Sequence, residues 1–129
     1  MAASPIPPDL HELESEVMEQ VWRAGEASVR DVMEALNANG DKPRAYTTYM
    51  TILSRLADKG LLERRRDGRT DHYRPALSRE EYAHARSTAE VEALVDRYGD
   101  VALSHFARQV AELDPKRRSA LERLARDRS

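Results

Sequence analysis

The sequence lacks cysteine altogether, and this absence excludes several kinds of chemistry at once. With no Cys among 129 residues, the chain cannot form disulfides, bind a metal through thiolates or use a cysteine nucleophile. Aromatic residues make up only 5% of the chain, with one Trp and one Phe, which argues against a deep aromatic-lined pocket. We therefore expect a protein of a reducing compartment that needs no cofactor.

Long apolar runs are also missing. No stretch of about 18 apolar residues occurs, so no membrane-spanning helix is expected. Residues 1–8 have neither the basic start nor the apolar centre of a signal peptide, and they read as a flexible Pro-containing tail. We expect cytoplasmic localisation without membrane insertion. The length suits one domain, or a small domain with an appendage.

The net charge of −2 hides an uneven distribution. Residues 1–41 carry two Lys and Arg against nine Asp and Glu, whereas residues 42–74 carry nine against four, and residues 75–129 carry ten against ten. The middle segment is therefore locally +5. A polyanion responds to a basic face rather than to the sum over the molecule, so this asymmetry favours a nucleic-acid binder. The alternative at this point is an ordinary solvated surface.

Three segments in the first half repeat apolar residues at helical spacing. The first covers residues 9–24, the second runs from Ser28 to Asn39-Gly40, and the third runs from near Thr47 to Lys59-Gly60. We expect Asp9 and Ser28 to act as N-caps. In the third helix the spacing predicts one buried face. Its residues are Tyr49, Ile52, Leu53 and Leu56.

After Gly60 the pattern changes from helix to strand. Residues 61–66 and 70–75 flank Asp67-Gly68-Arg69, which is a specific turn signal, so they predict a β-hairpin. Three helices followed by a hairpin is the order of a winged helix, in which the hairpin forms the wing. We therefore expect a mainly α fold with a small β-hairpin wing. Its winged helix-turn-helix DNA-binding domain should cover residues 9–76.

The remaining chain, residues 77–129, is predicted to form three more helices. Ser78 and Glu81 make a capping box for a helix to about Arg97, and Asp114-Pro115 opens the last helix. These helices have too little apolar surface to fold alone, so we expect a helical dimerisation domain whose core is completed by a second copy. The residues expected in this homodimer interface are Tyr82, Leu94, Leu103, Phe106, Val110, Leu113, Leu121 and Leu124.

The exposed face of the third helix is the most informative surface. It carries short polar side chains and one Arg, where an ordinary solvated face would favour Glu, Lys and Gln. Thr can bond phosphates or base edges, methyl groups can touch thymine, and Arg can fork onto guanine. Strand alternation means that the wing arginines cannot all face DNA. The residues expected at the DNA are Lys42, Arg44, Tyr46, Thr47, Thr48, Met50, Thr51, Arg55, Arg64, Arg66 and Arg69.

Motifs of catalysis are missing from the sequence. His11-Glu12 does not open a His-Glu-x-x-His zinc motif, because Ser15 stands where the second His is required. No glycine-rich phosphate loop and no Gly-x-Ser-x-Gly elbow occurs. We therefore expect neither an enzyme nor a metal site, and we interpret the four His as surface or packing residues.

Several stretches resemble the BlaI/MecI penicillinase-repressor family, in particular its actinobacterial members. The resemblance runs over residues 10–124, and its most specific part is the block Tyr-Thr-Thr-Tyr-Met-Thr-Ile-Leu-Ser-Arg-Leu at residues 46–56. The other stretches that carry it are residues 13–22, 29–32, 45–56 and 60–62, together with Tyr73. This resemblance implies a homodimeric transcriptional repressor that binds an inverted-repeat operator and controls β-lactam resistance or stress genes.

The resemblance also implies a mode of release. In this family a membrane-bound sensor metalloprotease responds to β-lactam, and the repressor is cut in its dimerisation region before a Phe. His105-Phe106 occupies that position here, where some relatives have Asn before the Phe. Some relatives have Arg in place of Met50, so the operator sequence can differ. A copper-responsive branch uses a Cys-x-Cys motif, which this chain lacks.

Two other functions stay open at the level of sequence. The first is a winged-helix regulator released by a small-molecule or metal effector, and a thermal shift with candidate effectors would reveal it because a ligand stabilises the state it binds. The second is a winged helix used only for contacts with other proteins. Loss of all affinity for duplex DNA at low salt would favour this second alternative.

Overall fold

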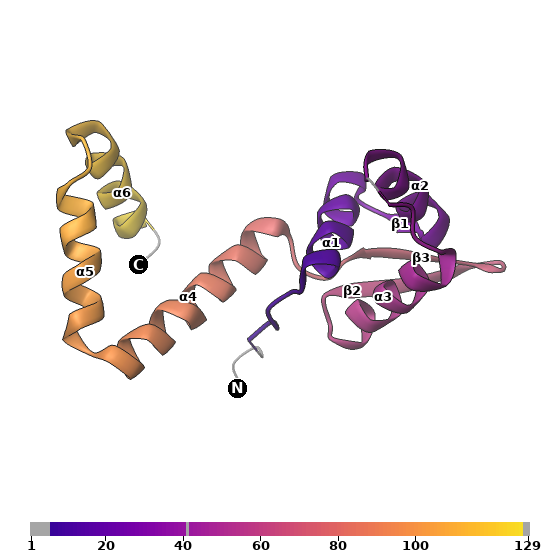
Figure 1. Ribbon diagram of the computed structural model, residues 1–129, viewed down its shortest axis with the longest axis horizontal. Coiled ribbons are helices and arrows are strands. Elements are labelled where there is room, and N and C mark those ends of the chain that lie inside the picture. Colours follow the sequence, from indigo (N-terminus) through magenta and orange to yellow (C-terminus); the bar gives the residue numbers. More distant parts are fainter. Residues whose placement is uncertain (1–5, 41, 128–129) are drawn as a thin grey trace. The chain divides into compact units, whose positions relative to one another are not determined.

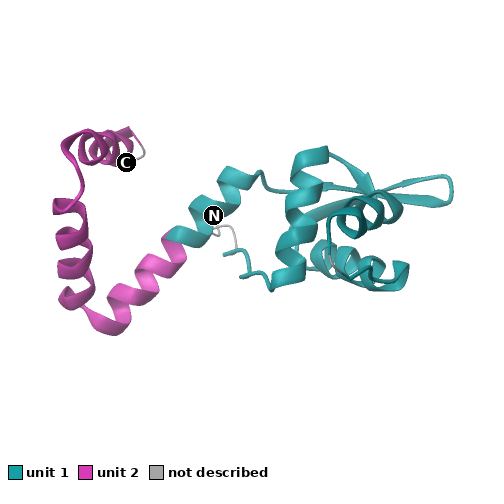
Figure 2. Cartoon of the chain, turned by 45° about the horizontal axis from the view of Figure 1, so that its top comes forward, with its two compact units in different colours: residues 1–87 teal, residues 88–129 magenta. Residues whose placement is uncertain are grey.

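The computed structural model describes residues 6–40 and 42–127. The chain divides into two compact units, Met1–Ser87 and Thr88–Ser129 (Figure 2). Its elements follow the predicted order of three helices, a hairpin and three further helices (Figure 1). They are α1 (Glu12–Ala24), β1 (Ala27–Ser28), α2 (Val29–Asn39), α3 (Tyr46–Asp58), β2 (Leu62–Asp67), β3 (Thr70–Pro75), α4 (Arg79–Tyr98), α5 (Asp100–Ala111) and α6 (Pro115–Asp127).

The start of α1 corrects the sequence prediction. We expected Asp9 as the N-cap, but the helix begins at Glu12 with His11 as its N-cap. The Asp9 carboxylate instead accepts a hydrogen bond from the backbone N–H of the next residue, Leu10, at 3.0 Å. Glu14 reaches back to accept the His11 backbone N–H at 3.1 Å. This carboxylate three residues into the helix satisfies a free backbone donor and outweighs the statistical preference for Asp as a cap.

The other predicted caps are confirmed. Ser28 Oγ accepts the backbone N–H of Asp31 at 3.1 Å, and Asp31 Oδ2 accepts that of Ser28 at 3.0 Å. Ser78 and Glu81 make the same reciprocal pair at the start of α4, with N···O distances of 3.0 and 2.8 Å. Asp114 Oδ1 accepts the backbone N–H of Arg117 at 2.9 Å in the first turn of α6. Local capping chemistry therefore defines where these helices begin.

A three-stranded antiparallel sheet with the order β1-β3-β2 lies beside the first three helices (Figure 1). The predicted hairpin pairs β2 with β3, from Leu62 opposite Pro75 to Asp67 opposite Thr70. The strand β1 was not predicted, because two residues are too short to show an alternating pattern. It joins the sheet by pairing Ala27 with Tyr73.

The hydrophobic core lies between the three helices and the sheet in the first unit. All four residues predicted for the buried face of α3 are buried, and Tyr49, Leu53 and Leu56 are fully so. The remaining buried apolar residues come from α1, β1, α2, β3, the first residue of β2 and Leu61 just before it. They are Val17, Met18, Val21, Ala27, Val29, Val32, Leu61, Leu62 and Tyr73.

The first turns of α4 belong to the same unit and pack against α1. The Trp22 and Tyr82 ring centroids are 5.7 Å apart, and Trp22 Nε1 donates to the Leu77 carbonyl at 2.8 Å. The Tyr82 hydroxyl donates to the carbonyl of Pro8 at 3.0 Å, and Pro7 is buried. Of the predicted tail, residues 1–5 lie outside the described residues, whereas Pro7 and Pro8 contact the folded unit.

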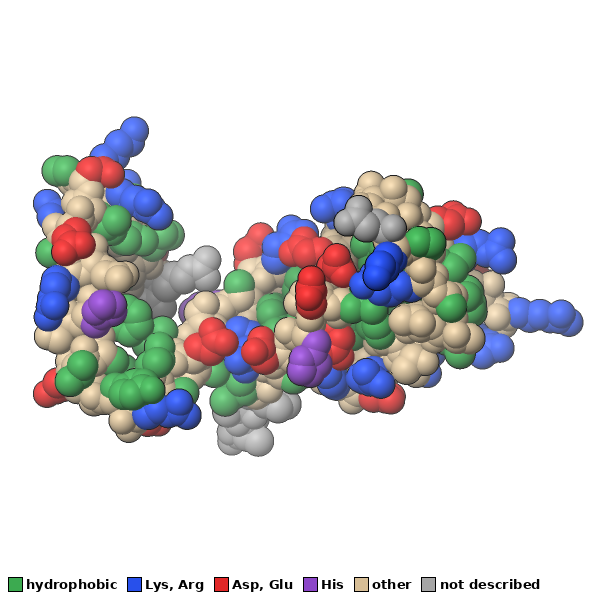
Figure 3. All heavy atoms as spheres, viewed as in Figure 1, with side chains coloured by type: hydrophobic (Ala, Val, Ile, Leu, Met, Phe, Trp, Pro, Cys, Tyr) green, Lys and Arg blue, Asp and Glu red, His purple; other side chains and the backbone are tan. Residues whose placement is uncertain are grey.

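The second unit has a different character. Among the described residues of α4, α5 and α6, none is buried. Hydrophobic side chains instead lie at the surface of these helices (Figure 3). The large exposed apolar residues of this unit are Val91, Leu94, Tyr98, Val101, Leu103, Phe106, Val110, Leu121 and Leu124. In the described part of the chain, no helix combines the length and apolarity that a membrane span requires.

Candidate nucleic-acid interface

The helix α3 has two opposite faces. Its apolar face is sealed in the core, whereas Tyr46 and Met50 keep 46% and 44% of their surface exposed. Thr47, Thr51 and Arg55 are exposed at spacings of four residues and therefore lie along one side of the helix. Thr48 is half-buried at the edge between the two faces. The core thus fixes which side of α3 is available to a partner.

The loop before α3 is held by Asn37, a residue that our sequence analysis did not single out. The Asn37 side chain accepts the backbone N–H of Arg44 and donates to its carbonyl, both at 3.0 Å. The hydroxyl of Tyr49 donates to the same Asn37 oxygen at 2.7 Å. An Asn at a helix end is a weak signal, and its partners seven and twelve residues away give no pattern in the sequence. This clamp sets the backbone that carries the exposed side chains of Lys42 and Arg44.

The arginines of β2 alternate between the two faces of the hairpin, as predicted. Arg65 lies opposite His72 in the ladder and hydrogen-bonds Glu26 next to β1. This hydrogen bond from Arg65 holds the pKa of the Glu26 carboxyl below its ordinary value. Arg64 and Arg66 lie on the other face, opposite Tyr73 and Asp71. Arg65 is therefore committed to an ion pair within the protein.

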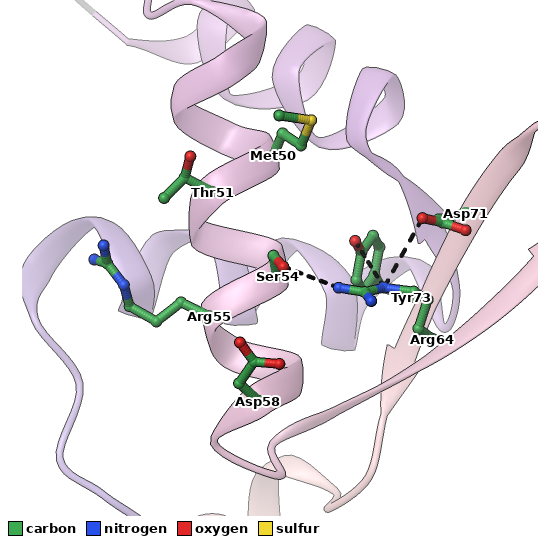
Figure 4. A pocket seen from close by; sticks show the side chains of 8 residues that line it. All are labelled: Met50, Thr51, Ser54, Arg55, Asp58, Arg64, Asp71 and Tyr73. Carbon is green, nitrogen blue, oxygen red and sulfur yellow. Dashed lines mark hydrogen bonds and ion pairs between the residues drawn. The ribbon is translucent and has the colours of Figure 1, made fainter.

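Arg64 lies between the hairpin and α3 (Figure 4). Its Nε donates to the Tyr73 hydroxyl at 3.2 Å and its Nη2 donates to Ser54 Oγ at 3.0 Å. The hydrogen bond with Tyr73 and the nearby carboxylates of Asp71 and Asp58 hold the pKa of the Arg64 guanidinium above its ordinary value. No local sequence pattern predicts this arrangement, because Ser54 and Tyr73 are ten and nine residues away from Arg64.

The other arginines predicted at the DNA have fewer contacts within the protein than Arg64. Arg66 donates to the Gly68 carbonyl at 3.2 Å, but 68% of its side chain is exposed. Arg69 lies in the hairpin turn and is exposed. Arg55 points away from Arg64 along the side of α3 (Figure 4). Lys and Arg side chains also project at the hairpin tip in Figure 3.

Two open hollows lie beside α3. One, of about 500 Å³, is lined by residues of α3, β2 and β3, among them Arg55 and Arg64. The other, of about 560 Å³, is lined by the start of α2, the start of α3 and the hairpin, including Tyr46 and Arg69. Met50 lines both hollows. Both hollows are also lined by Asp71 and Tyr73 of the hairpin, so they adjoin each other between α3 and the hairpin.

The hollows beside α3 bring together Tyr46, Met50, Thr51, Arg55, Arg64 and Arg69, whereas Lys42, Arg44, Thr47, Thr48 and Arg66 line neither hollow. The proposed cleavage position is separate, because His105 and Phe106 lie within α5. Tyr82, which we grouped with the dimerisation residues, is half-buried against Trp22. Among the residues that the structure describes, no three His, Cys, Asp or Glu side chains gather as a metal site would require.

Comparison with known proteins identifies the relatives of this chain. Its sequence matches the penicillinase repressor family over residues 10–127. The transcriptional regulators BlaI of Mycobacterium tuberculosis strains CDC 1551 / Oshkosh and H37Rv are each 40% identical over 117 residues, which cover 88% of this chain and 83% of the relative. The solution structure of the DNA binding domain of the repressor BlaI superposes with a TM-score of 0.52 at 28% identity, over 62% of this chain and 94% of that domain.

These similarities concern both the fold and the functional class of the protein. The superposition confirms the predicted winged helix. The relatives are transcriptional regulators rather than enzymes, in agreement with the missing catalytic motifs. Since the family match covers most of the chain, the protein belongs to the penicillinase repressor family of transcriptional regulators.

Proposed function

We propose that this chain represses transcription by binding an inverted-repeat operator in double-stranded DNA as a homodimer. The observation that carries the proposal is the exposed side of α3, where short polar side chains and Arg55 lie next to the basic hairpin. This surface belongs to the segment whose local charge is +5, from nine Lys and Arg against four Asp and Glu. The DNA binding domain of the repressor BlaI, which shares this fold, supports the same role.

Each part of the surface has a distinct task in this proposal. Side chains on α3 read base edges in the major groove, where a Thr or Met methyl can meet thymine and an Arg can fork onto guanine. Residues of the preceding loop and the hairpin contact phosphates, which sets orientation and affinity. The base-reading set is Tyr46, Thr47, Thr48, Met50, Thr51 and Arg55. The phosphate set includes Lys42, Arg44, Arg66 and Arg69.

The second unit supports the proposed homodimer. Its helices expose Leu103, Phe106 and Leu121 by 49%, 39% and 41%, and burying the exposed part of such a side chain stabilises an assembly by about 1 kcal/mol each. A second copy of the chain is the occupant that an inverted repeat requires, because two-fold symmetric DNA sites are read by two-fold symmetric proteins. Pairing through this unit would also link two winged helices and multiply their affinity for two half-sites.

Two variants and a control test the interface. On an operator selected from genomic DNA, Arg55→Ala should weaken binding by about 1–3 kcal/mol and relax the preference at one base pair. Arg69→Ala should weaken all sequences alike and reduce the slope of log affinity against log salt by about one. Arg23→Ala removes the same charge from an exposed position at the end of α1 and should change neither quantity. If only Arg23→Ala had an effect, the interface would be misplaced.

For release, we propose proteolysis at His105-Phe106 by a membrane-bound sensor metalloprotease, with β-lactam resistance or stress genes as the regulated set. The bond lies inside the helix α5, so α5 must open locally before a protease can reach it. Cutting there would separate Phe106 from the preceding part of the helix and weaken the dimer. Expression with a cognate sensor and β-lactam, followed by mass spectrometry, should yield fragments that end at His105. A chain that stays intact during induction would contradict this mode of release.

A further inference from the structure

We propose that Arg64 is a positioning residue that ties the hairpin to α3, and that Asp71 holds it there and thereby limits non-specific binding. The inference rests on the proposed operator binding but assigns Arg64 a role other than contact with phosphate. It concerns two charged residues on one face of the hairpin, opposite in sign and both directed toward the same hollow beside α3 (Figure 4).

The geometry of Arg64 is that of a link between three elements. From β2, its guanidinium donates to Ser54 on α3 and to Tyr73 on β3, with N···O distances of 3.0 and 3.2 Å. The guanidinium carbon also lies 5.4 Å from the centroid of the Tyr73 ring. Because Tyr73 is only 2% exposed, its hydroxyl is a fixed anchor at the edge of the core. These bonds use two of the five N–H donors of the guanidinium and fix its position between α3 and the hairpin.

Asp71 supplies the opposite charge. Its Oδ2 lies 3.9 Å from Arg64 Nε, and its Oδ1 lies 3.6 Å from Arg66 Nη1. Oδ1 is itself buried and has no hydrogen-bond partner among the described residues. A carboxylate oxygen in that position is costly unless cations surround it, and two guanidinium groups do so here.

Together these contacts have a consequence for DNA recognition. The hairpin is held at one position relative to the base-reading side of α3, so phosphate contacts and base contacts are made in a single register. The carboxylate of Asp71, which lines both hollows, also opposes the approach of phosphates to Arg64 and Arg66. Without it the surface around Arg64 and Arg66 would be more positive and would attract the phosphates of any sequence more strongly. Asp71 should therefore raise specificity at the expense of total affinity.

Charge-conserving variants of the full-length chain test the role of Arg64. Arg64→Lys keeps the charge but loses the forked geometry, so affinity for the selected operator should fall about tenfold. Affinity for random duplex DNA and its salt slope should stay unchanged. Arg23→Lys makes the same exchange at the exposed end of α1, outside the proposed interface, and should leave both affinities and their ratio unaltered. Ser54→Ala removes the acceptor on α3 and should lower the ratio in the same direction as Arg64→Lys.

Asp71→Asn tests the second half of the inference. Affinity for random DNA should rise several-fold, and the salt slope should increase by about one because Arg64 gains a phosphate contact whereas Arg66 already has one. The inference is overturned if Arg64→Gln weakens operator and random DNA equally and reduces the slope by about one, or if Asp71→Asn leaves random binding unchanged. A wild-type chain that binds no duplex DNA would refute the proposed function itself, which separates the two failures. Thermal melting of each variant identifies any that is unfolded. If an Arg64 variant is unfolded, the operator-to-random ratio of Ser54→Ala tests the role of Arg64 instead.

Discussion

The two units of the chain differ in how they bury apolar surface. In the described part of the first unit, thirteen apolar residues form a buried core, and they come from all three of its complete helices, from the sheet and from Leu61 just before β2. In the described part of the second unit no residue is buried, although α5 and α6 have apolar faces of similar periodicity. Amphipathic helices alone therefore do not make a core.

The difference lies in what each unit can place opposite its helices. The first unit has a sheet and helices on which to pack it, so its apolar faces have partners within the unit. The second unit has two short helices and the end of α4, which is too little to enclose a core. We therefore expect the first unit to be stable alone and the second to depend on association.

Separating the two units should give the largest change in folding and in operator affinity. A chain ending at Ser87 keeps the contacts of Tyr82 and should remain a folded monomer, whereas residues 88–129 alone should be largely unfolded at low concentration. The isolated first unit should bind the operator about 10²-fold to 10⁴-fold more weakly than the full chain. Circular dichroism, sedimentation and fluorescence anisotropy measure the three quantities. A truncated chain that binds as tightly as the whole would contradict the comparison.

Truncating one large apolar side chain in each unit sharpens the contrast. Leu53→Ala, in the core of the first unit, should lower the free energy of unfolding by about 2–5 kcal/mol at every protein concentration. Phe106→Ala should cost roughly 3–5 kcal/mol only where the dimer is populated, because Phe106 is 39% exposed in the single chain. Denaturant unfolding over a hundredfold range of protein concentration distinguishes the two variants. If Phe106→Ala lowered the free energy of unfolding equally at every protein concentration, Phe106 would not be buried by a second copy of the chain.

The Glu14–Lys59 ion pair gives the first unit a dependence on pH. Burial alone would raise the pKa of the Glu14 carboxyl, but hydrogen bonds from Lys59 and from the His11 backbone outweigh it and lower the pKa below 4.5. The side chain of Glu14 is 4% exposed, and Lys59 Nζ lies 2.9 Å away. Because the folded-state pKa is below the unfolded one, the pair stabilises the fold above about pH 4.5 and loses this effect as the pH falls through the folded-state pKa.

Glu14→Gln should therefore cost about 1–3 kcal/mol near neutral pH and flatten the acid limb of the stability curve. Glu19→Gln is a matched control, because Glu19 pairs with Arg79 at the surface, with 47% and 50% of the side chains exposed. That pair should contribute no more than about 1 kcal/mol. Thermal melts between pH 3 and 7 measure both variants, and equal losses would show that burial of Glu14 has no special role.

The smallest expected effects come from two glycines at helix ends. Gly25 follows α1 with φ +84°, and Gly99 precedes α5 with φ +62°, so an Ala at either position is strained by about 1 kcal/mol. Neither substituted Cβ would meet a neighbour within 4 Å, so the strain is confined to the backbone. Gly25→Ala should lower the melting temperature at all concentrations. Gly99→Ala should mainly change how the melting temperature depends on protein concentration. The opposite assignment of the two effects to the two variants would contradict the difference between the units.

Much of the fold could be predicted from the sequence because its signals are local. The capping boxes at Ser28 and Ser78 join residues three apart, and the buried face of α3 repeats every three or four residues. The turn at Gly68 is equally local. The same locality identified the exposed side of α3 and the alternation of the wing arginines. Asp9 was assigned wrongly, because a buried Glu14 made His11 the better cap.

By itself, then, the sequence determined the order of the elements, the segment that carries the positive charge and the side of α3 that faces outward. Only the tertiary structure decided which of those charges are free. Arg65 is paired with Glu26, 39 residues away, and Arg64 with Ser54, ten residues away on another element. Tyr82 bonds Pro8 across 74 residues. Such pairs depend on how elements pack, and a one-dimensional pattern encodes spacing along the chain but not distance across it.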